Sequence, residues 1–273
     1  MQQNIDTDSD SAGGRIINVW KQNVQEEFAR IQETVSSYPV IAMDTEFPGE
    51  VYQILTTDET TSYEKLKKNC DRLKLIQIGF SFGKKDGTIK PGASTWQFNL
   101  QYDLNCDYFA KNSLDMLLNA GLDFDKHRTD GIDPSLFCAL LWTSGIMLND
   151  NVDWITFHSS YDFGYFAKVI SGEPLPDGEA DFNQLVNAYF PVRYDLKLIS
   201  NTKRGLNILA SDCGIIRKGA THQAGSDALI TLETYFSIIN NDPKWSERKQ
   251  EFFGRMAGLG KDIFFKSIII KLA

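Results

Sequence analysis

The stretch Tyr38-Pro-Val-Ile-Ala-Met-Asp-Thr-Glu-Phe-Pro48 decides the fold of this 273-residue chain. A short apolar run delivers two acids, Asp44 and Glu46, that are separated by one residue. Successive side chains of a strand alternate between its faces, so both carboxylates project to the same side at the end of a buried strand. Two anions this close repel each other unless a cation lies between them. Hard oxygen ligands suit magnesium or manganese, and the pair therefore indicates a divalent-metal site.

A second interpretation of the same acids needs no metal. The strand can also lie at the edge of a sheet and exit into a turn at Phe47-Pro-Gly49, which would leave both carboxylates solvated. Because Asp-x-Glu is a common triplet, further ligands elsewhere in the chain have to decide between the two interpretations.

The composition is that of an ordinary globular protein, with 42% hydrophobic and 23% charged residues. The length suits one large α/β domain or two small ones. A net charge of −8 argues against a protein that coats nucleic acid through a general basic surface, but not against an enzyme with an acidic metal site. The four cysteines form no Cys-x-x-Cys motif, which favours reduced thiols in a cytosolic or nuclear protein.

Both ends of the chain are expected to lie outside the folded domain. Residues 1–15 are polar and lack the basic and apolar regions of a signal peptide, which predicts a disordered tail. In the C-terminal tail, residues 261–273, the apolar run 263–270 is too short to span a bilayer, and it is either a docked element or a sticky tail. No internal repeat or long linker divides residues 16–260, so we expect one domain.

Hydrophobic periodicity predicts how the domain is built. Residues 16–36 have helical spacing and are followed by a strand at 40–43. The β-rich segments 73–82 and 95–100, joined through a turn at 83–87, predict an antiparallel start to the sheet. Further predicted elements are helices over 113–119, 134–144, 164–170 and 182–189 and a strand over 154–157. This order indicates an α/β fold with a mixed central sheet flanked by helices.

A lysine-rich segment follows a polar loop over residues 49–62. Its basic residues are Lys65, Lys67, Lys68, Arg72 and Lys74. A solvated surface is a better explanation of this cluster than a phosphate site.

A third acid, Asp162, follows the strand at 154–157, where His158-Ser-Ser-Tyr-Asp-Phe-Gly-Tyr165 turns into a helix. Loops at strand ends are where α/β folds place their chemistry. Judged alone, however, Asp162 is better explained as a helix N-cap or first-turn acid.

A fourth acid, Asp227, falls in the first turns of a helix that opens within Gly219-Ala-Thr-His-Gln-Ala-Gly-Ser-Asp227. The helix would direct Asp227 into the body of the protein, which is a costly place for an unpaired charge. His222 lies five residues earlier. Alone, this histidine would more often be a surface residue or a satisfied core residue.

The order of these segments resembles the three exonuclease motifs of the DEDD superfamily in its histidine variant: Asp-x-Glu on an early strand, Tyr-Asp at a strand-to-helix turn and His-x4-Asp on a late helix. In many members an asparagine stands a few residues before the aromatic-Asp pair, and His158 occupies that region here.

Longer stretches carry a closer resemblance. They are Met43-Asp-Thr-Glu-Phe-Pro-Gly49, Thr95-Trp-Gln-Phe98, Thr143-Ser-Gly145, Phe157-His-Ser-Ser-Tyr-Asp-Phe-Gly-Tyr165, Phe190-Pro-Val192, Tyr194-Asp-Leu-Lys197 and His222-Gln-Ala-Gly-Ser-Asp227. Together they resemble the Caf/Pop-type deadenylases, the poly(A)-shortening subunits of the Ccr-Not messenger-decay complex. The resemblance implies an RNase H-like domain that removes 5′-AMP from the 3′ end of poly(A) RNA. Expected partners are a Not-type scaffold, a Ccr-type deadenylase and antiproliferative regulators, in cytoplasm and nucleus.

The resemblance and the chemistry of the acids both imply hydrolysis with two divalent ions, Mg²⁺ or Mn²⁺. Asp44 is then shared by both ions, Glu46 and Asp227 complete the first site, and Asp162 holds the second ion, directly or through water. His222 is implied as the general base that accepts the proton of the attacking water.

Phe47 is a candidate for contact with the last nucleotide, because aromatic stacking holds a base without reading its edge. Core packing explains this residue equally well. Two alternative functions also stay open: a docking subunit of the decay complex with weak activity of its own, and an exonuclease directed at DNA.

Overall fold

The computed structural model describes residues 15–52 and 60–259. Apart from Arg15, the tails expected at the two ends lie outside these residues, as do residues 53–59 of the expected polar loop 49–62. No helix in the described parts of the chain is long and apolar enough to cross a bilayer. All four cysteines lie in the described parts, and none forms a disulfide there.

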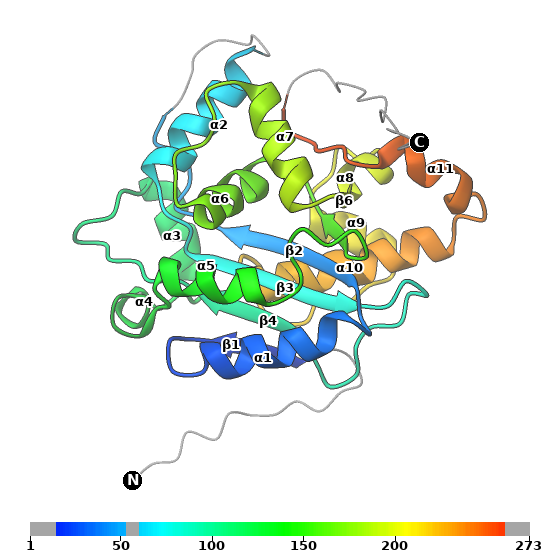
Figure 1. Cartoon of the computed structure of the whole chain (residues 1–273), viewed down its shortest axis with the longest axis horizontal. Coiled ribbons are helices and arrows are strands. Elements are labelled where there is room, and N and C mark those ends of the chain that lie inside the picture. Colours follow the sequence, from blue (N-terminus) through cyan, green and yellow to red (C-terminus); the bar gives the residue numbers. More distant parts are fainter. Residues whose placement is uncertain (1–14, 53–59, 260–273) are drawn as a thin grey trace, which may run out of the picture.

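Six strands form one mixed sheet in the order β1-β4-β3-β2-β5-β6 (Figure 1). Their bounds are β1 Arg15–Val19, β2 Val40–Glu46, β3 Gln77–Gly83, β4 Ala93–Asn99, β5 Asp153–Thr156 and β6 Val192–Asp195. Strands β2, β3 and β4 are antiparallel neighbours, whereas β1 pairs parallel with β4, and β5 and β6 continue parallel from β2. The predicted mixed sheet is confirmed. The edge-strand alternative for β2 is wrong, because β3 and β5 pair with its two sides.

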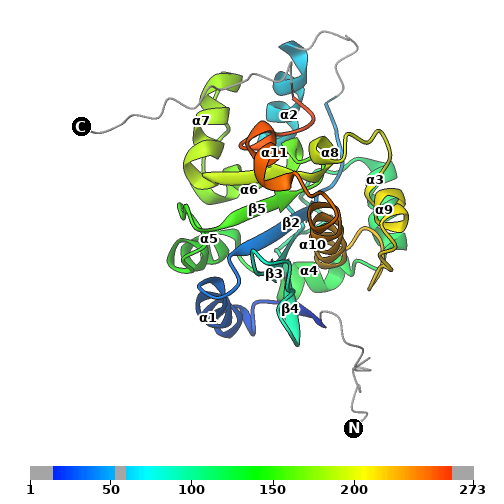
Figure 2. The same ribbon diagram turned by 90° about the vertical axis from the view of Figure 1, so that its right-hand side faces the viewer.

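Helices flank this sheet. Their bounds are α1 Val24–Val35, α2 Thr60–Arg72, α3 Lys111–Asn119, α4 Phe124–Asp130, α5 Pro134–Thr143, α6 Ser160–Ser171, α7 Glu179–Tyr189, α8 Leu196–Ile199, α9 Leu206–Asp212, α10 Ala224–Asn240 and α11 Trp245–Phe252. Helix α10 runs along one face of the sheet, while α1, α5 and α6 cover the other (Figure 2).

The helix predicted over residues 16–36 is wrong in its first part. Residues Arg15–Val19 form β1, and the helix begins only at Val24. The run Ile16-Ile-Asn-Val19 gains backbone pairing with β4, and this long-range pairing overrides its helical spacing. Asn23 closes the intervening turn by accepting a hydrogen bond from the Trp20 amide at 2.8 Å.

Helix α2 contains the lysine-rich segment and was not predicted. Its basic side chains meet acids and an aromatic ring of the protein itself. The contacts are Lys65 with Glu50, Lys67 with Asp71, Lys68 with Glu64 and Arg72 over the Tyr108 ring, and Lys74 just beyond the helix meets Asp107. These pairs support the surface interpretation of the cluster.

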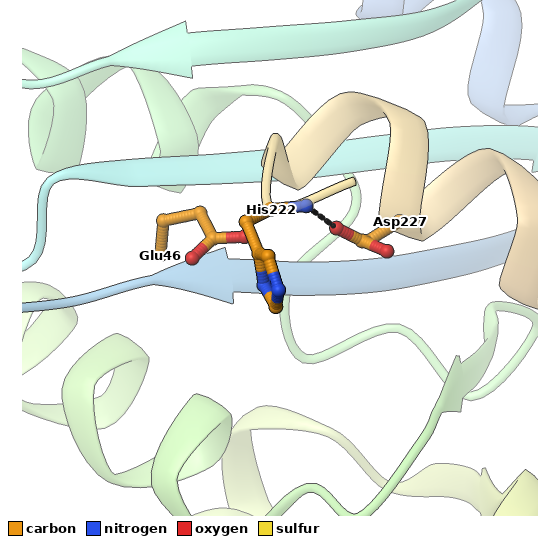
Figure 3. Close-up of side chains that lie close together, drawn as sticks. All are labelled: Glu46, His222 and Asp227. Atoms are coloured by element: carbon orange, nitrogen blue, oxygen red, sulfur yellow. Dashed lines mark hydrogen bonds between the residues drawn. The ribbon is translucent and has the colours of Figure 1, made fainter. Parts of the chain in front are cut away.

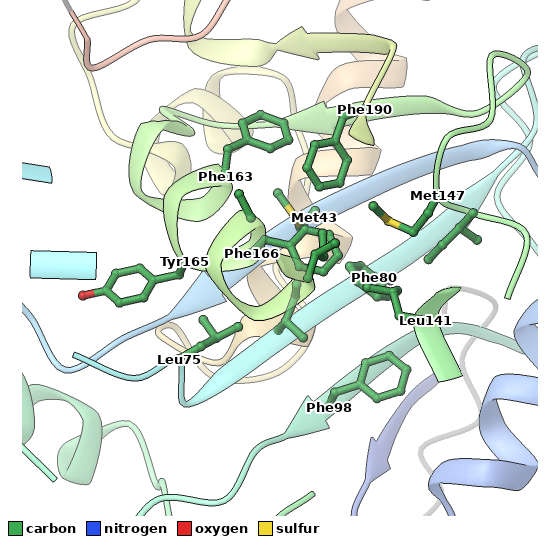
Figure 4. Packing of buried hydrophobic residues seen from close by; sticks show 14 of the residues in the cluster. Met43, Leu75, Phe80, Phe98, Leu141, Met147, Phe163, Tyr165, Phe166 and Phe190 are labelled. Atoms are coloured by element: carbon green, nitrogen blue, oxygen red, sulfur yellow. The ribbon is translucent and has the colours of Figure 1, made fainter. Parts of the chain in front are cut away.

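Alternation along β2 sends its side chains into two different cores. Ile41 and Met43 join the large aromatic core under α5 and α6, where Phe80 and Phe166 also pack (Figure 4). Val40 and Ala42 belong to a second core that contains residues of α10. Asp44 and Glu46 continue the Ala42 face, so the sheet directs both acids toward α10.

Candidate active site

Helix α10 brings Asp227 to the acids of β2. Asp227 lies in the first turn of the helix and is buried. One ligand atom from each of Glu46, His222 and Asp227 lies within 4.8 Å of the others (Figure 3). The structure therefore brings the end of the early strand and the beginning of the late helix together, while metal binding by these residues stays a prediction.

Both oxygens of Asp227 have protein partners. Its Oδ2 accepts a hydrogen bond from the His222 backbone amide at 2.9 Å, drawn as the dashed line in Figure 3. Its Oδ1 accepts from Nη2 of Arg217 at 2.7 Å. Each carboxylate oxygen has two lone pairs, so these bonds orient Asp227 and leave acceptor capacity for a further ligand.

A glycine permits the close approach of α10 to the sheet. Gly79 on β3 is paired with Asp44, and a Cβ atom built on it would lie 2.1 Å from the carbonyl oxygen of Ala224 and 2.7 Å from the amide nitrogen of Gly225. Any side chain at position 79 would therefore push the beginning of α10 away from β2.

Three glutamines fix the beginning of α10. The side-chain oxygen of Gln97 accepts from the Gly225 amide at 2.8 Å, and that of Gln77 accepts from the Ala224 amide at 3.3 Å. These bonds satisfy amides that have no partner within the helix. Gln223 accepts from the amide groups of both Gln97 and Gln77, at 2.9 and 3.2 Å. Sequence reasoning missed this network, although Gln97 stood inside the quoted stretch Thr95-Trp-Gln-Phe98.

His222 combines a fixed backbone with an exposed side chain. Its φ of 61° lies in the left-handed region, which is unusual for a residue with a side chain. The Asp227 carboxylate holds its amide, and the anchored Gln223 follows it. The imidazole is thereby placed beside Glu46 while it remains open to solvent.

Asp162 reaches the site from the opposite helical layer. It lies in the first turn of α6 and is buried, with Ser159 at the N-cap position. The N-cap interpretation is therefore wrong for Asp162, whereas the first-turn position is confirmed. Its Oδ1 accepts a hydrogen bond from the Thr45 hydroxyl at 2.5 Å, which ties it to β2 between the two acids of that strand.

The turn that begins α6 depends on Asp195, which sequence reasoning did not single out. This fully buried carboxylate accepts hydrogen bonds from the backbone amides of His158, Ser159, Lys197 and Ala257, and from the Ser159 hydroxyl. His158 has a φ of 62°, so the turn is a tight one that these bonds hold in place. The available signal was the quoted stretch Tyr194-Asp-Leu-Lys197.

Burial and mutual repulsion govern the charge of the site. Burial raises the pKa of Asp44 well above its ordinary value, and the neighbouring Asp227, Asp162 and Glu46 raise it further. Burial, Asp227 and Asp162 have the same effect on the pKa of Glu46. Burial raises the pKa of Asp162 to about 7, against the hydrogen bond from Thr45. Converging anions with raised pKa values form a donor set that fits a hard divalent cation.

Phe47 lies in an aromatic stack beside these acids. Its ring centroid is 4.7 Å from that of Tyr165 and 5.3 Å from that of Tyr161. The side chain is partly buried, so packing accounts for much of its surface. Contact with a nucleotide stays a prediction.

A mixed sheet with acids at the end of β2 and in the first turns of α6 and α10 defines the class of RNase H-like exonucleases. The profile of the family described as CAF1 family ribonuclease matches residues 19–134. Poly(A) ribonuclease pop2 of Schizosaccharomyces pombe is 42% identical over 230 residues, which cover 82% of this chain and 69% of that protein. The chain belongs to the CAF1 family of ribonucleases, and the resemblance found in the sequence is confirmed.

A further relative and two solved structures are also similar to this chain over most of its length. The CCR4-NOT transcription complex subunit 7 of Caenorhabditis elegans is 39% identical over 262 residues, covering 91% of this chain and 84% of that protein. The solved structure of S. pombe Pop2p in its Mg²⁺- and Mn²⁺-bound form matches with a TM-score of 0.84 at 39% identity, covering 89% of this chain and 99% of the other. The structure of the yeast NOT1 MIF4G domain co-crystallised with CAF1 matches with a TM-score of 0.74 at 30% identity. The match covers 89% of this chain and 96% of the other.

Proposed function

We propose that this protein is a metal-dependent 3′→5′ exoribonuclease that shortens the poly(A) tails of messenger RNA and releases 5′-AMP. The observation that carries the proposal is the meeting of Glu46, His222 and Asp227 in a chain that is 42% identical to a poly(A) ribonuclease. The nuclease is proposed to occupy residues 16–260 as a single domain. The docking-subunit alternative is not better supported by these observations.

The residues proposed to hold two divalent ions, Mg²⁺ or Mn²⁺, are four acids. Asp44 would be shared by both ions, Glu46 and Asp227 would complete one site, and Asp162 would serve the other. The relative in its Mg²⁺- and Mn²⁺-bound form supports this choice of metal. Ions bound there would supply an activated water and stabilise the departing 3′ oxygen.

The chain's own groups orient these acids and move the proton. The Thr45 hydroxyl orients Asp162, and the His222 amide and Arg217 orient Asp227. The exposed imidazole of His222 is the proposed general base. What supports this role is that one of its ring nitrogens lies within 4.8 Å of the ligand oxygens of Glu46 and Asp227, and that the side chain is open to solvent.

The substrate is expected to be held at its end rather than along its length. A chain with a net charge of −8 offers no general basic surface for the phosphate backbone. The rim of the Phe47 ring is the proposed contact for the terminal adenosine, and its stacking on Tyr161 and Tyr165 would hold it rigid. A contact between the protein and the 2′-hydroxyl of the terminal ribose would allow the enzyme to distinguish RNA from DNA.

The proposed partners are those of the decay complex. A Not-type scaffold is supported by the relative that was crystallised with a NOT1 MIF4G domain, and membership of a CCR4-NOT assembly by the relative named as its subunit 7. A Ccr-type deadenylase and antiproliferative regulators complete the proposal. Such an assembly would act on messenger RNA in the cytoplasm and in the nucleus.

The test is a shortening assay with the purified full chain, Mg²⁺ or Mn²⁺, and 5′-labelled RNA that ends in poly(A). Stepwise shortening from the 3′ end is expected, and the His222→Ala variant should lose about 10²–10⁴-fold of this activity. DNA of the same sequence tests the DNA-directed alternative, and it should remain intact. Folded wild-type protein without activity would contradict the enzyme and favour the docking subunit.

A further inference from the structure

Arg217 places a fixed positive charge inside the acid cluster. Its Nη2 donates to Oδ1 of Asp227 at 2.7 Å, its Nη1 to the Ser226 hydroxyl at 2.9 Å, and its Nε to Oδ1 of Asn207 at 2.9 Å. Only 15% of the side chain is exposed. A guanidinium does not lose its proton in proteins, so the charge is permanent.

The field of this charge extends beyond its contact with Asp227. Asp227 and Asp162 raise the pKa values of Asp44 and Glu46, and Arg217 lowers both of them. The neighbouring Lys218 is directed elsewhere. It pairs at 2.6 Å with Glu233, which lies nearly two turns further along α10 than Asp227.

We propose that Arg217 is an internal counter-cation, which stabilises the acid cluster when no metal is bound and weakens the binding of divalent ions by like-charge repulsion. This inference rests on the proposed metal site. A divalent ion beside Asp227 has to bind close to the positive guanidinium, and the two cations repel. Removal of Arg217 would then destabilise the metal-free protein and strengthen metal binding.

A purely structural role makes a different prediction. Arg217 also joins α9 to α10, because Asn207 belongs to the first helix and Ser226 to the second. The loss of such a brace would lower the melting temperature by the same amount with and without metal. The melting-temperature rise on addition of metal therefore separates the two roles.

The experiment measures thermal melting of the full chain after chelation and again with Mn²⁺ or Mg²⁺, and Mn²⁺ affinity by calorimetry, without RNA. The metal-free Arg217→Gln protein should melt about 4–8 °C below wild type. Its rise on addition of Mn²⁺ should exceed that of wild type, and its dissociation constant for Mn²⁺ should be about three- to tenfold lower.

Two variants serve as controls. Arg217→Lys keeps the positive charge, so its melting temperature should rise on addition of metal as much as that of wild type. Lys218→Gln removes the ion pair with Glu233, which lies nearly two turns along α10 from Asp227, and should also keep the wild-type rise in melting temperature.

The proposal would be overturned if the melting temperature of Arg217→Gln rose on addition of Mn²⁺ by no more than that of wild type. A variant that folds neither with nor without Mn²⁺ would also overturn it, because Arg217 would then be a brace. A variant that folds only with Mn²⁺ would support it. A wild-type protein that neither binds Mn²⁺ nor melts higher with it would overturn the metal site itself, and the inference with it.

Discussion

Gly79 on β3 lies directly opposite Asp44 on β2, and the first turn of α10 rests on its backbone. A Cβ atom at position 79 would lie 2.1 Å from the Ala224 carbonyl oxygen, which is a backbone atom and cannot rotate away. The distance between the acids of β2 and Asp227 is therefore set by the absence of a side chain on the neighbouring strand.

Gly79→Ala should lower the rate of poly(A) shortening by about 10²-fold, because a displacement of about 1 Å at a catalytic site has this effect. Gly83→Ala is the matched control on the same strand. Its Cβ would meet the ring of Phe236 at 2.6 Å, further along α10, where a side chain can shift. Gly83→Ala should cost about 1–3 kcal/mol of stability and keep most of the activity. Equal activity of the two variants would argue against this account of Gly79.

Asp44→Ala should cost more activity than Glu46→Ala. Asp44 is proposed to be shared by two ions and Glu46 to serve one, so the first substitution affects both metal positions. The measurement is the rate of RNA shortening at saturating Mn²⁺, with melting curves to show that both variants are folded. A Glu46→Ala protein that is the less active of the two would contradict the proposed division of roles.

Asp195→Asn should destabilise the protein strongly, although residue 195 has no proposed contact with metal or RNA. The amide replaces one acceptor oxygen with donors that face other donors, and a buried charged acceptor of several hydrogen bonds is lost. We expect a loss of about 3 kcal/mol, or about 6–12 °C in melting temperature.

Asp133→Asn is the control for that substitution. Asp133 caps α5 by accepting hydrogen bonds from the amides of Ser135 and Leu136, at an exposed site. Asparagine is an equally good N-cap, so its melting temperature should change little. An Asp195→Asn protein as stable as Asp133→Asn would show that the turn before α6 does not depend on the carboxylate.

The stability of the metal-free protein should depend on pH through Asp162. Burial raises the pKa of this carboxyl from 3.8 to about 7. The folded state then binds the proton more tightly than the unfolded chain, so this group favours folding below the unfolded pKa and its contribution is lost as the pH rises toward 7. The full effect is on the order of 4 kcal/mol.

The comparison with Asp162→Asn removes this carboxyl together with the upward shift that it causes in the pKa values of Asp44 and Glu46, and both changes have the same sign. His127 and His158 have pKa values lowered by burial and contribute with the opposite sign, but they do so in both proteins. The melting temperature of the chelated wild type, relative to the variant, should fall as the pH is raised from about 4 to about 7. A constant difference across that range would mean that Asp162 is not protonated in the folded state.

The sequence predicted the part of the site that depends on local periodicity. Alternation along β2 placed Asp44 and Glu46 on one face, and helical spacing placed Asp227 in the first turn of α10. Strand alternation and helical spacing could not show that Asp162 and His222 belong to the same site. Only the family resemblance predicted that.

What the sequence left out depends on contacts between distant segments. The spacing of Ile16 to Val19 suits a helix, and only pairing with β4 makes the segment a strand. Helix α2 was not predicted because its many lysines indicated only a solvated surface. Its buried face is formed by Leu66 and Cys70, and Leu73 continues the helical spacing just beyond the helix. The roles of Arg217 and the three glutamines follow from partners that lie far away along the chain, so no pattern in a single sequence predicts them.

The most direct test of the account is anomalous diffraction from crystals of the full chain soaked in Mn²⁺. We predict two manganese peaks between β2, α6 and α10, with Asp44 bound to both, Glu46 and Asp227 bound to one, and Asp162 bound to the other. Crystals that diffract well and show no peak at these four carboxylates, or peaks only elsewhere, would contradict the proposed catalytic site.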